Sequence, residues 1–280
     1  MKINTNIVSM QTQNNLRKNS MNLENAMNRL SSGKRINTAA DDAAGLAISS
    51  RMQTKMRGMD VGVRNSNDGI SLVQTAEAAL GSITNILQRM RELAVQSANG
   101  TNNTTDRDSL NSEYTQLKTE IDHIATNTTF NGVDLLNAGA AVIKIQLSDV
   151  ANDSMDINLI DAQTSGMNLA AAGGAAGLSA DITSAANASN ALLQLDEAVT
   201  EISDKRAGFG ASLNRLQFNI DNMSSMSTNL ASAKSRVEDA DMAKEVSEMT
   251  KNKVLVQSGM AMLSQANQNP QMITQLLQGN

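Results

Sequence analysis

The 280-residue chain has no cysteine, one histidine, one proline and four aromatic residues, and its formal net charge is −5. Without cysteine and with a single histidine, it cannot form a thiolate or multi-histidine metal site, and so few aromatics argue against a thick core. Apolar residues still make up 40%, and proline, which breaks helices, is almost absent, so the composition predicts a mostly α protein.

The first 40 residues hold six basic residues against one acid, Glu24. Such a start also occurs in transit peptides and nucleic-acid-binding arms, but no more than two basic residues adjoin and no aromatics lie between them for base stacking. The start lacks the apolar stretch of a secretory signal, and no run of about 20 apolar residues could span a membrane. We therefore expect neither nucleic acid nor membrane as a partner.

The N-terminal segment carries an apolar stripe at helical spacing that stops at Gly33, a natural residue for ending a helix. Asp41 and Asp42 are candidates to cap the next helix. The members of the stripe that we assign to a polymerisation seam are Ile3, Ile7, Met10, Leu23, Met27 and Leu30.

Two further helices are expected before residue 130. The first has a glycine-spaced middle and then a regular apolar seam from Val73 to Ala94. A turn at 99–103 follows, and Thr105 with Asp108 resembles a capping box that opens the second helix. Asn131-Gly132 is predicted to form another turn.

The middle of the chain changes period. Residues 143–147 and 155–159 alternate apolar and polar side chains on either side of a turn-like stretch, which predicts a β-hairpin. Residues 163–190 are rich in Ala, Gly and Ser, and we expect a loose connection there.

From Leu192 to Val237 apolar residues recur at spacings of three and four, the pattern of a long helix with a narrow seam. Gly208 and Gly210 weaken that helix by about 1 kcal/mol each relative to Ala. The polar stretch 238–241 then predicts a break. A second register follows, with a charge at Lys253 and the seam residues Met242, Val246, Met249, Val256, Met260 and Leu263.

The predicted fold is mostly α: a long helical coiled-coil and rod bundle with a small β-hairpin, in which the N- and C-terminal helices pair. Isolated helices are marginal in water, so the terminal helices need partners, and the architecture is typical of a self-assembling protein. Three domains are expected: residues 1–42 with 241–280 as a polymerisation domain, 43–137 with 186–240 as a helical rod, and 138–185 as a short variable segment.

Several separated motifs resemble bacterial flagellin. They are residues 1–6, 30–37, 41–49, 67–71, 87–96 and 130–132 in the front half, and 241–245 and 262–270 near the end. The resemblance covers nearly all of 1–137 and 190–280.

This resemblance implies the structural subunit of a bacterial flagellar filament, a self-assembling homopolymer that drives motility and lies outside the cell. It also implies unfolded passage through the flagellar type III export apparatus, a secretion chaperone, and contacts with the filament cap and hook-junction proteins. In the family, residues matching Arg89, Leu93, Gln96 and Glu113 contact a host innate immune receptor or neighbouring protofilaments. Arg89, Leu93 and Gln96 have spacings that place them on one helix face.

Two other readings remain open. A hook–filament junction protein shares both terminal signatures, and a secreted coiled-coil effector would form no polymer. We expect no enzyme and no cofactor: the histidine, His123, lacks the His-Glu-x-x-His pattern of a metalloprotease, and Asp41 and Asp42, as neighbours in sequence, do not form a facing carboxylate pair.

Overall fold

The computed structural model describes residues 5–137, 142–167 and 177–278, with side chains placed as far as residue 268. Its helices are α1 (Ile7–Ser32), α2 (Ala43–Ala98), α3 (Thr104–Asn127), α4 (Ala185–Glu238) and α5 (Met242–Gln278). The strands form two antiparallel pairs, β1 (Thr129–Phe130) with β2 (Val133–Asp134) and β3 (Val142–Gln146) with β4 (Ser154–Asn158). The mostly helical fold class, with paired terminal helices and a small β-hairpin, is confirmed.

The chain divides into two compact units. Unit 1 comprises residues 1–56 and 228–280, and unit 2 comprises residues 57–227. Both divisions fall inside long continuous helices, α2 and α4, and not at the sequence breaks near 42 and 240 that suggested a boundary. The expected three-domain division remains a prediction.

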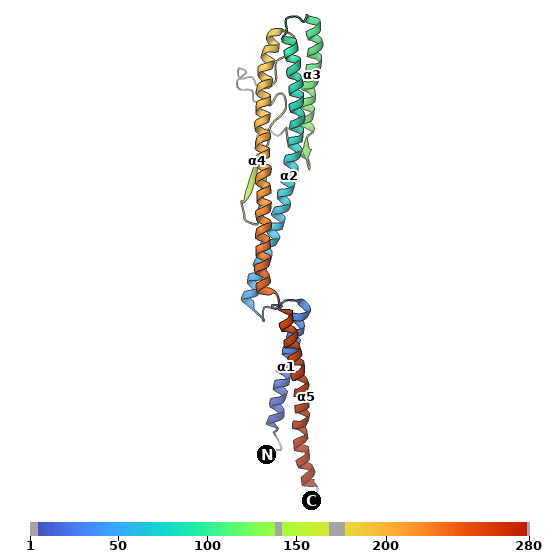
Figure 1. The fold of residues 1–280 in the computed structure, drawn as a ribbon, viewed down its shortest axis with the longest axis vertical. Helices are drawn as coiled ribbons and strands as arrows, with labels where there is room; N and C mark the ends of the chain where they lie inside the picture. Colours follow the sequence, from blue (N-terminus) through green and yellow to red (C-terminus); the bar gives the residue numbers. More distant parts are fainter. Residues whose placement is uncertain (1–4, 138–141, 168–176, 279–280) are drawn as a thin grey trace. The chain divides into compact units, whose positions relative to one another are not determined.

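Within unit 2, α2, α3 and α4 lie alongside one another (Figure 1). Two ion pairs join α2 to α4: Arg91 pairs with Asp196 at 2.7 Å, and Glu77 pairs with Arg206 at 3.2 Å. Because the later residue of α2 meets the earlier residue of α4, the two helices are antiparallel. The core between the helices contains the predicted seam of α2 from Val73 to Ala94, which is completely buried at Val73, Leu80, Leu87 and Ala94 among others. The α4 seam is buried at Leu195, Ile202, Phe209, Leu216 and Met223, as its period predicted.

Local signals set the ends of the helices, with one correction. Gly33 adopts a left-handed φ of 70° after α1, and Asp42 Oδ1 accepts the Gly45 N–H at 2.9 Å at the start of α2. The capping box of α3 is formed by Asn103 and Asp106, not by Thr105 and Asp108. Asn103 is the better cap because its side-chain oxygen accepts the Asp106 N–H while its own N–H reaches the Asp106 carboxylate.

The predicted β-hairpin forms with Ile145 opposite Met155 and Ile143 opposite Ile157. Two glycines of α2 allow the hairpin to approach this helix closely. A Cβ placed on Gly62 would lie 2.3 Å from the Leu147 carbonyl oxygen, and one on Gly58 would lie 2.4 Å from the Asp149 Cβ. The glycine-spaced middle of this helix is therefore the seat of the hairpin.

The described residues of the segment expected to be loose are packed and hydrogen-bonded. Met167, Leu178 and Ile182 are buried in the core of unit 2. Thr164 donates its N–H and its hydroxyl to the Asp122 carboxylate at 2.7 and 2.9 Å. Composition misled here because scattered apolar residues, without a period, are enough to anchor an irregular segment. Residues 168–176 lie outside the described part.

Tyr114 is buried in this core, and its hydroxyl is among the buried polar atoms without a hydrogen-bond partner. Burial raises the pKa of the phenol to about 12. A buried polar group without a partner costs stability. We expect Tyr114→Phe to leave unit 2 unchanged or up to about 1 kcal/mol more stable, measured by urea unfolding. Tyr114→Leu, which also removes ring contacts, should destabilise it, and a clear loss of stability in Tyr114→Phe would show that the hydroxyl has a partner.

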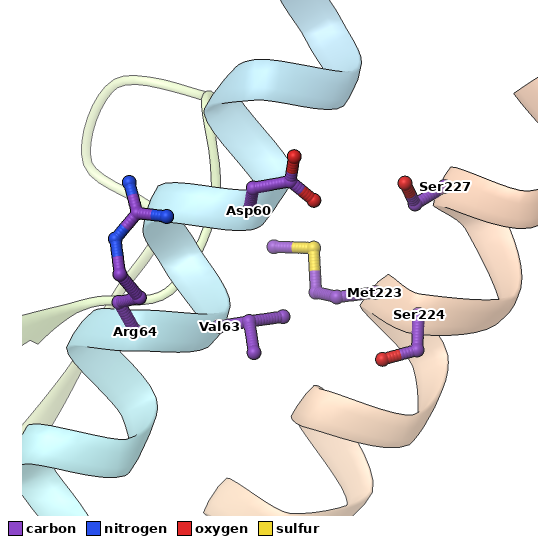
Figure 2. A pocket seen from close by; sticks show the side chains of 6 residues that line it. All are labelled: Asp60, Val63, Arg64, Met223, Ser224 and Ser227. Atoms are coloured by element: carbon purple, nitrogen blue, oxygen red, sulfur yellow. The ribbon is translucent and has the colours of Figure 1, made fainter. Parts of the chain in front are cut away.

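A shallow groove of about 460 Å³ lies between α2 and α4 in unit 2 and is lined by Asp60, Val63, Arg64, Met223, Ser224 and Ser227 (Figure 2). Met223 extends from α4 towards α2, where Val63 faces it, and Arg64 points away from both. Its only charged residues, Asp60 and Arg64, are exposed and lie one turn apart on α2. The groove offers no arrangement of groups suited to catalysis.

Candidate functional site

The candidate site is the pair of terminal helices in unit 1. Helices α1 and α5 lie side by side and run in opposite directions (Figure 1). Near one end, Asn6 Nδ2 donates to the Ala266 carbonyl at 2.9 Å and Ser9 Oγ donates to Asn267 Oδ1 at 2.9 Å. Near the other end, Arg29 lies 3.7 Å from Glu245.

The surface shared by α1 and α5 follows a seven-residue repeat, as in a coiled coil. Its buried or half-buried members on α1 are Ser9, Thr12, Leu16, Asn19, Leu23, Ala26 and Leu30, and on α5 they are Glu245, Met249, Asn252, Val256, Gly259, Leu263 and Ala266. Small residues bring the helices together: a Cβ on Gly259 would lie 3.1 Å from Leu16 Cδ1. The two helices thus form an antiparallel pair with a partly polar seam.

The residues assigned from sequence to the polymerisation seam divide between this seam and the outer surface. Leu23, Leu30, Met249, Val256 and Leu263 are half-buried in the pair. In contrast, Ile7, Met10, Met27, Met242, Val246 and Met260 are between 44% and 63% exposed. Ile3 lies outside the described residues. Lys253, expected within the seam, is exposed, and the neighbouring Asn252 is buried there instead.

The apolar pattern misled here because α5 carries apolar residues over more than one stripe. Its inward positions include Glu245, Asn252, Gly259 and Ala266, which an apolar template passes over. The outward positions retain the larger side chains. Val8, Met21, Val254, Leu255 and Met262 add to the exposed apolar residues of unit 1, each at least 40% exposed. We refer to the exposed apolar residues of α1 and α5 together as the outer apolar surface.

A polar junction joins the two chain segments where α1 ends and α5 begins. The Arg35 N–H donates to the Glu238 carbonyl at 2.7 Å, and the Ala240 N–H donates to the Gly33 carbonyl at 3.0 Å. Lys34 Nζ lies 2.5 Å from the buried carboxylate of Glu238, which Lys234 also approaches at 3.6 Å. The junction fixes the relative position of the loops that precede α2 and α5.

The ion pair at this junction gives unit 1 a defined pH dependence. The hydrogen bond from Lys34 lowers the pKa of Glu238 below 4.5, and the same bond raises the pKa of Lys34 above 10.5. A carboxylate whose pKa is lowered on folding stabilises the fold at pH values above its unfolded pKa, and this stabilisation is lost as pH falls through its folded pKa. A lysine whose pKa is raised on folding stabilises the fold at pH values below its unfolded pKa, and this stabilisation is lost as pH rises through its folded pKa. The pair therefore contributes fully between about pH 5 and pH 10.

We expect Glu238→Gln to lower the melting temperature of assembled filaments, in which unit 1 is folded, at neutral pH, with the difference from the unchanged chain shrinking as pH falls below 4.5. Circular dichroism melts across pH 3–7 measure this. Glu248→Gln is the matched control, since Glu248 makes an exposed pair with Lys251 at 3.3 Å and such pairs contribute little. A pH-independent difference would show that the Glu238 charge is not responsible.

The four residues matched to receptor or protofilament contact lie in unit 2 and are not equivalent. Arg89 donates from Nε and Nη2 to Glu113 Oε1 at 3.0 and 2.9 Å and also pairs with Glu92 at 2.9 Å, contacts that raise the pKa of Arg89. Arg89 and Gln96 are exposed and Glu113 is half-exposed, whereas Leu93 is 1% exposed and packs in the core. Arg89, Leu93 and Gln96 lie on one side of α2, but only Leu93 points into the core.

Among the described residues, no group of three or more His, Cys, Asp or Glu side chains could hold a metal ion. His123 is exposed and stands 4.0 Å from Glu120 on the same helix. The described helices also include none with the length and hydropathy to span a bilayer.

Both ends of the chain match regions of known protein families. Residues 3–141 match the bacterial flagellin N-terminal helical region, and residues 192–277 match the bacterial flagellin C-terminal helical region. The flagellin of Listeria monocytogenes is 47% identical over 99% of both chains, and that of Bacillus subtilis is 43% identical over 99% of this chain and 100% of its own.

Solved structures agree with this. A crystal structure of Bacillus cereus flagellin is 47% identical, with a TM-score of 0.50, and covers 61% of this chain and 94% of its own. A putative flagellar hook-associated protein from Vibrio parahaemolyticus has a TM-score of 0.61 over 71% of this chain and all of its own, but at 13% identity it shows a shared fold alone. Family models at both ends and full-length relatives above 40% identity converge on one conclusion: this chain belongs to the bacterial flagellin family.

Proposed function

We propose that this protein is the structural subunit of a bacterial flagellar filament and that it polymerises through unit 1. The observation that carries the proposal is the outer apolar surface on α1 and α5. Side chains such as Ile7, Val8 and Met262, each more than 60% exposed, are costly to leave in water. Neighbouring copies that cover them would convert this cost into binding energy.

Seeded polymerisation tests the proposal. Purified protein added to short filament fragments should elongate them, as seen by electron microscopy, above a critical concentration. A chain that stays monomeric at high concentration, with or without seeds, would overturn the proposal and would instead favour the secreted effector considered from sequence. The hook–filament junction alternative is not favoured, because the full-length relatives are flagellins.

We further propose that unit 1 folds fully only on assembly. The α1–α5 seam is partly polar and narrow, so it offsets little of the ordering entropy of roughly 1–2 kcal/mol per residue. Disorder at the termini suits passage of an unfolded chain through the type III export apparatus, followed by assembly under the filament cap beyond the hook-junction proteins. Hydrogen exchange would test this: residues 7–30 and 245–265 should exchange quickly in the monomer and slowly in the filament.

The same exposed residues suit a secretion chaperone. Val246, Leu255 and Met260 on α5 are 40–52% exposed, and an apolar groove that covers an amphipathic helix recognises such residues. Binding to this region before export would also delay premature polymerisation.

We propose that Arg89, Gln96 and Glu113 form a surface that an innate immune receptor can contact. The support is an exposed ion pair at 2.9 Å with Gln96 two turns from Arg89 on α2. Leu93 is omitted because its side chain is buried. Arg89→Ala should weaken receptor signalling, and Arg91→Ala, which removes a similar exposed pair with Asp196, is the control. Equal effects of the two variants would refute the assignment.

A further inference from the structure

The most exposed and the most buried of the described methionines lie in different units. The chain has 17 methionines. Within the described side chains, Met10, Met21, Met27, Met242, Met260 and Met262 are 47–61% exposed, and all lie on α1 or α5 in unit 1. Met59, Met90, Met155, Met167 and Met223 are at most 3% exposed, and all lie in unit 2.

This division matters because a thioether is both apolar and chemically reactive. A peroxide-class oxidant transfers one oxygen atom to the sulfur lone pair: the S–O bond forms, the O–O bond breaks, and hydrogen peroxide leaves as water. The product, methionine sulfoxide, is polar, and formation depends on access to the sulfur. The exposed methionines are therefore open to oxidation in the free subunit, whereas the buried ones are shielded.

We propose that the six exposed methionines of α1 and α5 are an oxidation site that controls assembly, with hydrogen peroxide or a related two-electron oxidant as the reactant. The inference rests on the proposed function, since it requires neighbouring copies to cover the outer apolar surface. A sulfoxide buried at that interface without a hydrogen-bond donor costs binding energy. Oxidised subunits should therefore join a filament poorly, while the thioethers already covered in a filament are protected.

The effect of oxidation depends on whether it occurs before or after assembly. Oxidation before assembly blocks addition of the subunit, and oxidation after assembly leaves the covered sites intact. Methionine sulfoxide reductases reverse the modification, one enzyme for each sulfoxide epimer. Leucine has similar volume and cannot be oxidised, so it separates the chemistry of the sulfur from the packing of the side chain.

The first experiment treats the full-length monomer and sheared filaments with the same dose of hydrogen peroxide and maps oxidised peptides by mass spectrometry. We expect an added oxygen on the six exposed methionines of the monomer, little on the five buried methionines of unit 2, and strong protection of the six in the filament. Equal oxidation of the six in monomer and filament would overturn the proposal.

The second experiment measures seeded elongation. We expect oxidation to raise the critical concentration about tenfold, the equivalent of about 1.4 kcal/mol, and treatment with both sulfoxide reductases to restore it. A chain with all six residues changed to Leu should elongate and resist peroxide. Met226→Leu is the control: Met226 is 38% exposed but lies in unit 2, so that variant should remain sensitive.

The outcomes distinguish this proposal from the proposed function. If untreated protein fails to elongate seeds, the filament role itself fails. If untreated and oxidised proteins elongate equally, or if the reductases do not restore elongation, only the oxidation site fails. Should the six-leucine variant not assemble, the reductase experiment on the unchanged chain still decides the question.

Discussion

Deleting residues 245–280 should abolish filament formation while leaving a folded helical rod. The deletion removes α5 from the buried Glu245 onwards, and with it the α1–α5 seam. The core of unit 2, from Leu72 to Phe209, contains no residue from the deleted segment. Deleting residues 1–30 should act in the same way, since it removes the partner helix α1. Circular dichroism melting and seeded elongation together measure the two effects.

Substitutions sharpen this prediction without removing a helix. Val246→Asp with Met260→Asp places charges on the outer apolar surface, where both side chains are already exposed, so the monomer should keep its fold and lose elongation. Val150→Asp, at a residue 56% exposed in the hairpin loop of unit 2, is the matched control. Filaments from either truncation, or from the double variant, comparable to those of the unchanged chain would contradict assembly through unit 1.

Gly62→Ala should destabilise unit 2 by about 1–3 kcal/mol, although alanine is the better helix former. The added Cβ would lie 2.3 Å from the Leu147 carbonyl oxygen and 3.0 Å from its carbon, both backbone atoms, so the hairpin must shift away from α2. The same substitution at Gly208 meets no atom within 4 Å and should stabilise α4 by up to about 1 kcal/mol.

Urea unfolding of the two variants gives opposite signs for the same chemical change. Because the hairpin packs on Gly62, amide exchange in β3 and β4 should also increase in Gly62→Ala and stay unchanged in Gly208→Ala. If both variants were more stable than the unchanged chain, the close contact between the hairpin and α2 would be wrong, and helix propensity alone would account for the result.

The helices of the rod can be predicted from the amino-acid sequence, because a single buried apolar stripe dominates each of them. The spacing from Leu192 to Val237 identified the large apolar side chains that are buried on α4, and that from Val73 to Ala94 identified most of those on α2. Two helix ends were predictable for similar reasons: Gly33 takes a positive φ that glycine allows readily, and Asp42 accepts a helix N–H within three residues. These are local or strictly periodic effects.

Which side of each helix faces another helix, and which residues far apart in sequence form ion pairs, became clear only from the tertiary structure. In α5, apolar periodicity could not show that Asn252 and Gly259 face α1 while Val246 and Met260 face outwards, because helix pairing selects the stripe that permits the closest approach. Leu93 shares the spacing of the exposed Arg89 and Gln96, but its side chain is buried in the core of unit 2. The ion pair of Lys34 with Glu238 joins residues about 200 positions apart, which no local pattern encodes. Local propensity and period are written in the sequence, whereas the choice among competing faces is made by packing.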